Sequence, residues 1–461
     1  MDNQRARVAI SYTNERHRSF ERVHGLVQVA IDHLGGFGRF VKTGQSVLIK
    51  PNQTVFYSAE DGVTTDPLIV RSLVRLSREA GASRIIVGEA SGDVMSSVKV
   101  MEITGVKAAA EREGAEVIDL KECVHRRVAI ANPLLLDHAM IPDVLLDTDV
   151  IIDAPKAKTH EHEHLSCACK NWVGTQAQQY RELHHDNDET QKAFMDIMSV
   201  TRPHLVVADA LICGEGDGPI GNTPRWCGCI VASDDPVATD VTVARMMGID
   251  WEKLRFLKAA EHHSLGVRDP GRIDIFGTPV EEVKFKAWIG HQGEFDYMTC
   301  NFIVGEDVSM EGTIGHVKAV LDAWVRQGVM NKIMWLKGTP TFLIGRAEDP
   351  RFEEHLKEGP YIVIDDAALE RYKTDPRVHF VPGHPVTRKA LPGVLDGMGM
   401  KNAGNAMMKL QQFQGWGMHN LEYGDTLQKA KTLAVPLAAA AAAAAITFAG
   451  VRLLSGRHNG T

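Results

Sequence analysis

The chain has 461 residues, of which 51 are basic and 59 acidic, so its formal charge is −8, and 44% of its residues are hydrophobic. This length accommodates two or three domains of about 100–200 residues each, and the balance of apolar and charged residues excludes a disordered chain and a multi-span membrane protein. The negative charge and the lack of a long Lys/Arg run predict no general attraction to nucleic-acid phosphates.

Short β-rich runs alternate with helical stretches through the first 280 residues. Strands are predicted at 8–11, 46–49, 84–87, 115–118, 150–153, 204–208 and 228–232, and helices at 22–34, 67–80, 98–113 and 236–247. Two segments, Thr65-Asp66-Pro67 and Ser233-Asp234-Asp235-Pro236, each place a capping side chain before a proline, which is typical of a helix start. The alternation predicts an α/β domain over residues 1–285, with a mostly parallel sheet flanked by helices.

The pattern changes after residue 285. A helix is predicted at 312–327, strands at 332–336, 341–344, 361–364 and 378–381, and a helix between the last two. These elements predict a second, smaller α/β domain over residues 286–400. Four glycines, Gly404, Gly415, Gly417 and Gly424, indicate a linker at 401–428 that leads to an Ala-rich tail at 429–461.

The tail contains an uncharged stretch of 19 residues from Leu433 to Val451, with eight alanines at 438–445 and Pro436 inside it. As a helix it is just long enough to cross about 30 Å of hydrocarbon. A membrane anchor is one interpretation of this stretch, and a docked or mobile Ala-rich helix is the other. The N-terminus shows no secretion signal, so we expect a cytoplasmic protein, either free or anchored to the membrane by this tail.

The seven cysteines are an odd number in a chain without a secretion signal, which indicates reduced thiols. Cys167 and Cys169, with Cys227 and Cys229, could form a four-thiolate metal site, but Cys-x-Cys is not the usual zinc or iron–sulfur spacing. Small buried residues of a packed sheet are the favoured interpretation of these pairs. An iron–sulfur cluster within the chain is therefore not expected, and the cofactor stays unknown.

Unusual polar groups follow several predicted strands. Lys50 and Asn52 follow VLI, Glu89 follows IIVG, Lys156 to His160 follow VIIDAP, and a GEGDGP run follows LVVADALIC. The carboxyl ends of parallel strands meet at one edge of the sheet, where open α/β folds bind ligands. The lysines would attract a carboxylate or phosphate, the helix N-terminus at Thr65 favours negative charge, and a desolvated lysine can become a base or a Schiff-base nucleophile.

The candidate catalytic residues are Lys156, Lys158, His160 and Glu89. The candidate ligand-binding residues are Lys50, Asn52, Thr65, Thr159, Lys170, Asn171, Gly174, Glu215, Asp217 and Gly218. For each residue alone, a solvated polar group or a flexible turn is the alternative. Four such groups at one sheet edge favour a site.

Three imidazoles, those of His160, His162 and His164, stand at alternate positions and would share one face of an extended chain. This pattern suits a divalent metal such as zinc, nickel, iron or manganese. A solvated polar loop is the alternative interpretation.

With these residues in view, the chain resembles the DUF362 family of uncharacterised bacterial and archaeal proteins, often fused to 4Fe–4S ferredoxin modules. The matching segments are VLIKPN, TTDP, VGEAS, PKAKTHEHEHLSCACKNWVG, VVADALICGEGDGPIGNTP and VASDDPVATDVTVARMMG, in family order over about 200 residues. The resemblance implies an α/β domain whose lysines, Lys-Asn pair and GDGP loop line one site, without an established reaction. The ferredoxin cysteines of the family are absent here, and the Ala-rich tail is an addition.

A more distant likeness of pattern is to nickel-pincer lactate racemases, in which a His-bearing, glycine-containing loop comparable to 158–174 follows a strand. In those enzymes lysine and histidines hold a nickel cofactor and move a proton and a hydride at a hydroxy acid. The characteristic glycine cluster of that family is missing from this chain. The likeness is therefore an analogy.

Three functions are compatible with the sequence. The favoured hypothesis is an enzyme of the oxidoreductase or isomerase class that binds a small anionic metabolite or cofactor in a Lys/Glu/His-lined cleft. This hypothesis includes both a metal-dependent and a metal-independent enzyme. The second is a membrane-associated redox or cofactor-handling partner related to iron–sulfur proteins, with a redox protein as its partner. The third is a non-catalytic ligand-binding protein.

Overall fold

The computed structural model describes residues 5–92, 96–160, 163–176, 189–289, 300–306 and 329–384, with single positions or short pieces between 313 and 394. The chain divides into two units, residues 1–394 and residues 395–461. The predicted linker at 401–428 and the Ala-rich tail at 429–461 lie outside the described residues. Among the helices that the structure describes, none is both long enough and apolar enough to cross a membrane.

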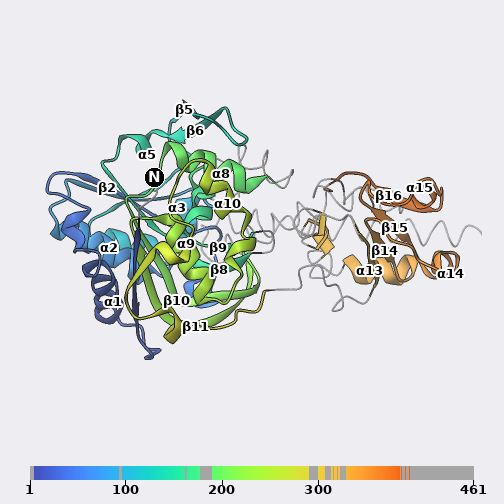
Figure 1. Cartoon of the computed structure of the whole chain (residues 1–461), viewed down its shortest axis with the longest axis horizontal. Helices are drawn as coiled ribbons and strands as arrows, with labels where there is room; N and C mark the ends of the chain where they lie inside the picture. The colour runs from blue at the N-terminus through green and yellow to red at the C-terminus, as the bar shows by residue number, and fades with distance from the viewer. Residues whose placement is uncertain are drawn as a thin grey trace, which may run out of the picture. The chain divides into compact units, whose positions relative to one another are not determined.

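A ten-stranded sheet dominates the first unit (Figure 1). Its strands are β1 (Ala6–Tyr12), β2 (Ser46–Pro51), β3 (Arg84–Glu89), β4 (Glu116–Asp119), β7 (Val150–Ala154), β8 (Lys156–His160), β9 (His164–Ser166), β10 (Leu205–Asp217), β11 (Gly221–Ser233) and β12 (Ile273–Gly277). A separate antiparallel pair is formed by β5 (His125–Ala129) and β6 (His138–Pro142).

The main path of the sheet runs β12-β1-β11-β10-β7-β2-β3-β4, and β8 joins β10 beside it. The strands from β10 through β7, β2 and β3 to β4 are parallel, whereas β11 is antiparallel to both of its neighbours. The expected mostly parallel sheet is therefore confirmed. Its inner parallel strands β2, β3 and β7 are buried apart from the first residue of β2 and of β3, as expected where helices cover both faces.

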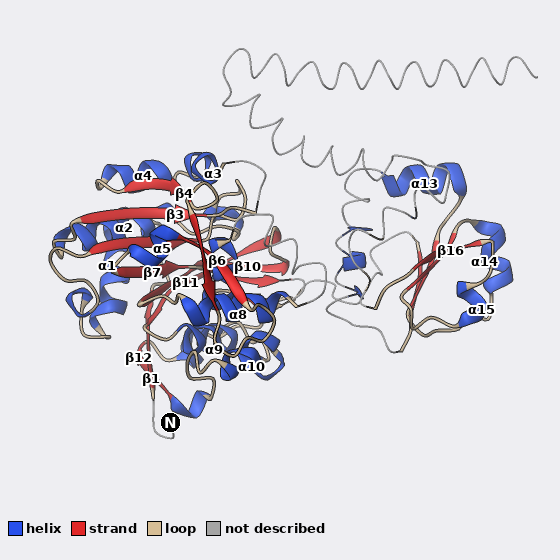
Figure 2. Cartoon of the chain, turned by 90° about the horizontal axis from the view of Figure 1, so that it is seen from above, coloured by secondary structure: helices blue, strands red, loops and turns tan. Residues whose placement is uncertain are grey.

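Helices cover the two faces of this sheet (Figure 2). They are α1 (Phe20–Asp32), α2 (Pro67–Glu79), α3 (Ser97–Ile103), α4 (Val106–Arg112), α5 (Asp143–Asp147), α6 (Ala168–Asn171), α8 (Thr190–Val200), α9 (Pro236–Met246), α10 (Arg255–His262) and α11 (Val280–Val283). Strand alternation sends Val47 and Ile49 into one core with α1, α2 and α4, and Leu48 into the other core with α8, α9 and α10.

Two of the predicted helix starts are confirmed by their capping bonds. The side chain of Asp66 accepts a hydrogen bond from the amide of Leu68 at the start of α2. The side chain of Asp235 does the same for Ala238 at the start of α9, and a proline follows each cap. Each carboxylate satisfies an amide that the first helical turn leaves unpaired.

Three element predictions need correction. The helix predicted at 98–113 is two helices, α3 and α4, because Gly105 between them has a φ of +82°. The GEGDGP run is mostly strand, because β10 extends to Asp217 and forms a hairpin with β11. Residues Lys156 to His160 are likewise a strand, β8, and not a loop after one.

A second sheet has four parallel strands, β13 (Asn301–Val304), β14 (Thr341–Ile344), β15 (Tyr361–Ile364) and β16 (Val378–Val381). Its helices are α13 (Val329–Lys337), α14 (Phe352–Glu358) and α15 (Glu370–Lys373). A separate smaller α/β sheet is thus confirmed, although the strand predicted at 332–336 is wrong because those residues belong to α13. Most of the helix predicted at 312–327 lies outside the described residues.

Candidate functional site

The candidate site begins where three parallel strands end side by side. Lys50 near the end of β2 stands opposite Asp153 of β7, and the next pair in register is Pro51 with Ala154. On the other side of β2, β3 ends at Glu89. The sequence therefore brings an ammonium and two carboxyl groups to one edge of the sheet, and all three residues are at most 2% exposed.

Lys50 and Glu89 form a buried ion pair, with 3.0 Å between Lys50 Nζ and Glu89 Oε1. The amide of Ala90 also donates to Oε1, and the amide of Gln53 donates to Oε2, both at 2.8 Å. Gly174 lies against this pair, because a Cβ at that position would be 2.8 Å from Lys50 Nζ and closer still to Glu89. The carboxylate of Glu89 therefore serves as the counter-ion of Lys50 and also accepts two backbone amides.

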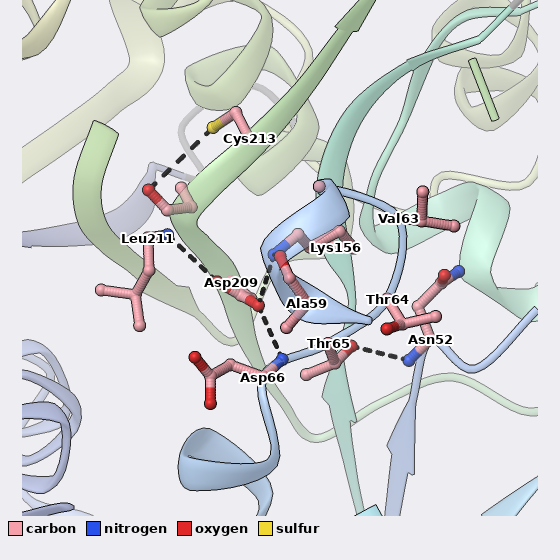
Figure 3. Close-up of polar contacts among 12 residues, drawn as sticks. Asn52, Ala59, Val63, Thr64, Thr65, Asp66, Lys156, Asp209, Leu211 and Cys213 are labelled. Atoms are coloured by element: carbon pink, nitrogen blue, oxygen red, sulfur yellow. Dashed lines mark hydrogen bonds and ion pairs between the residues drawn. The ribbon is translucent and has the colours of Figure 1, made fainter. Parts of the chain in front are cut away.

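A second buried ion pair joins Lys156 of β8 to Asp209 of β10 at 2.9 Å (Figure 3). The same oxygen of Asp209 accepts the amide of Asp66, and its other oxygen accepts the amide of Leu211. The carboxyl of Asp66 in turn contacts Arg18. Burial and the charge of Asp209 raise the pKa of Asp66.

Lys158 differs from these two lysines in its partners, although it is equally buried at 1% exposed. Its Nζ donates to the carbonyl oxygen of Val63 at 2.7 Å and to Oδ1 of Asn52 at 3.2 Å. Both acceptors are neutral, and among the described residues no carboxylate lies within ion-pair distance of Lys158. Burial, together with the positive charges of Lys170 and Lys156, lowers the pKa of Lys158 well below its usual value.

A chain of amide hydrogen bonds links Lys158 to Asp153. Asn52 Nδ2 donates to Asn171 Oδ1 at 3.0 Å, and Asn171 Nδ2 donates to Asp153 Oδ1 at 2.7 Å. These side chains are all at most 8% exposed. Burial raises the pKa of Asp153 well above its usual value, and its Oδ2 has no hydrogen-bond partner within the described structure.

The predicted ligand residue Thr65 fixes the loop after β2. Its hydroxyl donates to the carbonyl of Ala154 at 2.7 Å and accepts the amide of Asn52 at 2.8 Å. The amide of Thr65 donates back to the carbonyl of Asn52 at 3.0 Å. Thr65 is 0% exposed, so in this structure it supports Asn52 from behind.

Strand alternation places Lys156, Lys158 and His160 on one face of β8. Thr159 points the other way, and its hydroxyl donates to the carbonyl of Gly216. Gly218 lies so close to Thr159 that a Cβ would collide with the Thr159 carbonyl. Thr159 and Gly218 therefore serve the packing of β8 against the β10–β11 hairpin.

The remaining predicted residues fall into three groups. Lys170 is half-buried on α6, beside Asn171, and its charge acts on Lys158. Glu215 is directed elsewhere, since its Oε2 contacts Arg225 and accepts the amide of Trp288. Nothing is described of the side chain of Asp217.

The histidine prediction is only partly covered by the structure, because His162 lies outside the described residues. His160 at the end of β8 and His164 at the start of β9 stand opposite each other across a hairpin. The arrangement of the three imidazoles along one extended chain does not apply to His160 and His164, which lie on two antiparallel strands, and their prediction as metal ligands stays a prediction. Among the described residues, no group of three His, Cys, Asp or Glu side chains is arranged to hold a metal ion.

Sequence reasoning missed the buried aspartates that complete the site, namely Asp153, Asp209 and Asp240. The signal was present, because the first two end or interrupt the apolar runs VIID and VVAD. Asp240 of α9 accepts the amides of Ala168 and Cys169, at 2.7 and 2.9 Å. It therefore anchors the first turn of α6, the helix that carries Lys170 and Asn171, and burial raises its pKa to about 6.

Comparison with known proteins covers the same region. Residues 47–245 match the model of DUF362, a domain of unknown function, which confirms the resemblance noted in the sequence. A thylakoid-associated protein of Synechocystis sp. is 25% identical over 249 residues, which are 52% of this chain and 74% of the relative.

Two solved structures are similar with a TM-score of 0.34 each. One is a protein from Thermotoga maritima, 13% identical, with 75% of this chain and 77% of the other covered. The second is the lactate racemase apoprotein from Thermoanaerobacterium thermosaccharolyticum, 9% identical, with 87% of this chain and 91% of the other covered.

Proposed function

Starting from a chain whose residues 47–245 match the DUF362 domain, we propose that the protein is an enzyme that binds a small carboxylate or phosphate beside Lys158. One observation carries the proposal. Among the described residues, the hydrogen-bond acceptors of buried Lys158 are neutral oxygen atoms, whereas Lys50 and Lys156 each have a carboxylate partner.

The charges around Lys158 support an anionic ligand. Glu89 and Asp209 are already paired with lysines, and the raised pKa of Asp153 favours its neutral form. A proton on Lys158 therefore adds a positive charge beside Lys170, and no described carboxylate forms an ion pair with that charge. A bound anion would supply negative charge beside Lys170 and Lys158.

The route to the ligand position follows from exposure. The inner lysines are buried, but Lys170 and Gly174 at the outer side of the site are half-buried. A small ligand would thus enter past α6 and reach Lys158 from that side. Because the three lysines of the site are at most 1% exposed, we infer a small ligand, either a metabolite of a few carbon atoms or an inorganic phosphate.

Ligand-dependent stabilisation tests this function. Pyruvate, lactate, malonate and inorganic phosphate would be added to the full chain, and thermal unfolding would be followed for the wild type, Lys158→Met and Lys192→Met. Lys192 lies on α8 in a partly exposed ion pair with Glu189, so its variant is a control for the loss of a lysine. We expect at least one anion to raise Tm in the wild type and in Lys192→Met, and not in Lys158→Met. Equal shifts in all three proteins would contradict the proposal.

A separate proposal concerns location. The uncharged stretch from Leu433 to Val451 has the length of a membrane-crossing helix, and the Synechocystis relative is named for its association with thylakoids. We propose that this stretch attaches the protein to a membrane. Recovery of the full chain in the membrane fraction, and of a chain ending at residue 428 in the supernatant, is the expected result. Supernatant recovery of both would contradict attachment.

A further inference from the structure

We propose that Lys158 is an amine nucleophile that forms an imine with the carbonyl group of a small 2-oxo acid. This inference rests on the proposed function and specifies its substrate class. It starts from the directions of the hydrogen bonds at Lys158 Nζ, since these decide which side of the nitrogen remains available for chemistry.

Two of the four tetrahedral directions at this nitrogen are taken by hydrogen bonds, and a third by the bond to Cε. One hydrogen bond goes to the Val63 carbonyl, which is an acceptor only. The other goes to Asn52 Oδ1. In the neutral amine the fourth direction is the lone pair, and neither of the two partners can donate a hydrogen to it.

The orientation of Asn52 is what prevents it from occupying that lone pair. Its amino group is committed to Asn171 Oδ1, and the amino group of Asn171 is committed to Asp153. Reversing the Asn52 amide would set its oxygen against Asn171 Oδ1, so that two acceptors faced each other, and would set its amino group against Lys158 Nζ. The hydrogen bonds therefore assign the carbonyl oxygen of Asn52 to Lys158. Because of the direction of these hydrogen bonds, Lys158 Nζ donates to Val63 and Asn52, and its lone pair stays available to a substrate.

Burial completes the arrangement. A lysine surrounded by protein and flanked by the charges of Lys170 and Lys156 loses its proton more readily than a solvated one, which is the usual way to activate an amine for carbonyl chemistry. The substrate needs a carbonyl carbon to meet the lone pair and a negative group to meet the neighbouring ammonium of Lys170. A 2-oxo acid carries these two groups on adjacent atoms.

The chemical step balances without any further reactant. The nitrogen lone pair attacks the carbonyl carbon and forms the C–N bond, and the carbonyl oxygen leaves as water. That water takes both hydrogens of the neutral amine, the hydrogens that pointed to Val63 and Asn52. The product is the imine, and the reverse reaction with water releases the 2-oxo acid.

Reductive trapping tests the inference. The full chain would be incubated with pyruvate or 2-oxoglutarate and sodium borohydride, and the modified peptides would be identified by mass spectrometry. We expect one reduced adduct per chain, on Lys158, lost in Lys158→Met and retained in Lys192→Met. Lys158→Arg keeps a cation without the ability to form an imine, so an anion-induced Tm shift without an adduct in this variant would support the assignment further.

The outcomes separate this inference from the proposed function. Adducts spread over surface lysines, and equally abundant in Lys158→Met, would overturn the imine assignment. If lactate or phosphate raises Tm through Lys158 while neither 2-oxo acid is trapped, the anion site stands and the imine is wrong. If no anion shifts Tm and no adduct forms on Lys158, both are wrong. Circular dichroism of each variant establishes that the comparison is made between folded proteins.

Discussion

Gly174 lies directly against Lys50, and a Cβ atom at position 174 would be 2.8 Å from the Lys50 ammonium nitrogen. The carbonyl of Gly174 also accepts the amide of Ala90, at 3.0 Å. This contact closes the segment after α6 over the buried Lys50–Glu89 pair. The chain thus requires glycine here because of close approach, not because of an unusual φ angle.

Gly174→Ala should destabilise the protein. The added methyl group must displace either Lys50 or Glu89, and a buried ion pair that loses its geometry no longer offsets the cost of desolvating its charges. We expect a loss of about 1–3 kcal/mol in the free energy of unfolding, which is typical of overpacking. Urea unfolding followed by circular dichroism measures it.

The matched control is Gly25→Ala, in the middle of α1. A Cβ at position 25 meets nothing within 4 Å. Because alanine favours a helix interior over glycine, this variant should be stabilised by about 0.5–1 kcal/mol. If both variants changed stability in the same direction and to the same extent, the close contact at Gly174 would carry no energetic weight.

Lys156 and Lys158 offer a second comparison, since they lie on the same face of β8 and are equally buried. Lys156→Met leaves Asp209 as a buried carboxylate without its ammonium, which should cost about 3–5 kcal/mol. Lys158→Met removes a buried amine whose acceptors are neutral oxygens, so its cost should be limited to about 1–2 kcal/mol. Chemical unfolding of both variants at pH 7 measures the difference, and equal losses would show that the carboxylate partner is unimportant.

Much of the fold could be predicted from the sequence, because its elements depend on local patterns. The alternation of apolar runs located the seven strands named in the first domain, and Asp66-Pro67 located the start of α2. The strand predicted at 332–336 was wrong because local patterns are ambiguous in short apolar runs. The run in α13 is too short for its hydrophobic period to distinguish a helix from a strand.

The candidate site was less accessible to sequence reasoning. Lys50, Lys156 and Lys158 were recognised by their positions after strands, but their pairing depends on strand order. Asp209 reaches Lys156 only because β8 adds to β10 beside the main path of the sheet. The spacing of residues along the chain does not predict that β8 pairs with β10. Strand order is also the reason why Glu215 was assigned to the site, although its carboxylate contacts Arg225.

Asp240 provides a prediction about the support of α6. Its two oxygens accept the amides of Ala168 and Cys169, and an asparagine there could accept at only one of them. Asp240→Asn should therefore leave a buried amide unsatisfied and cost about 1–3 kcal/mol. Hydrogen exchange of the Ala168–Asn171 amides should become faster in this variant, whereas a uniform change across the whole protein would contradict a local anchoring role.

The pH dependence of stability has a clear source in Glu113, which is buried against three arginines of α2. Its carboxylate contacts Arg71, Arg75 and Arg78, at 2.9, 2.7 and 2.8 Å. The hydrogen bond from Arg75 is the main cause that lowers the pKa of Glu113 to about 2 from 4.5. Because the pKa of Glu113 is lower in the folded state than in the unfolded state, its ionised carboxylate stabilises the fold fully above pH 4.5. This contribution to the free energy of unfolding is lost as pH falls from 4.5 to about 2.

Glu113→Gln should therefore be less stable than the wild type by up to about 3 kcal/mol at pH 7, with a difference that shrinks toward zero near pH 2. Comparing the two proteins at each pH cancels the contributions of other acids, such as Asp153, whose raised pKa acts in the opposite sense. Glu116→Gln is the control, because Glu116 also pairs with an arginine, Arg84, but is exposed to solvent. Its loss should be at most about 1 kcal/mol. If the difference in the free energy of unfolding between the wild type and Glu113→Gln stayed constant from pH 7 to pH 2, the ion pairs with the arginines would not be its source. The loss of stability would then come from packing between α2 and α4.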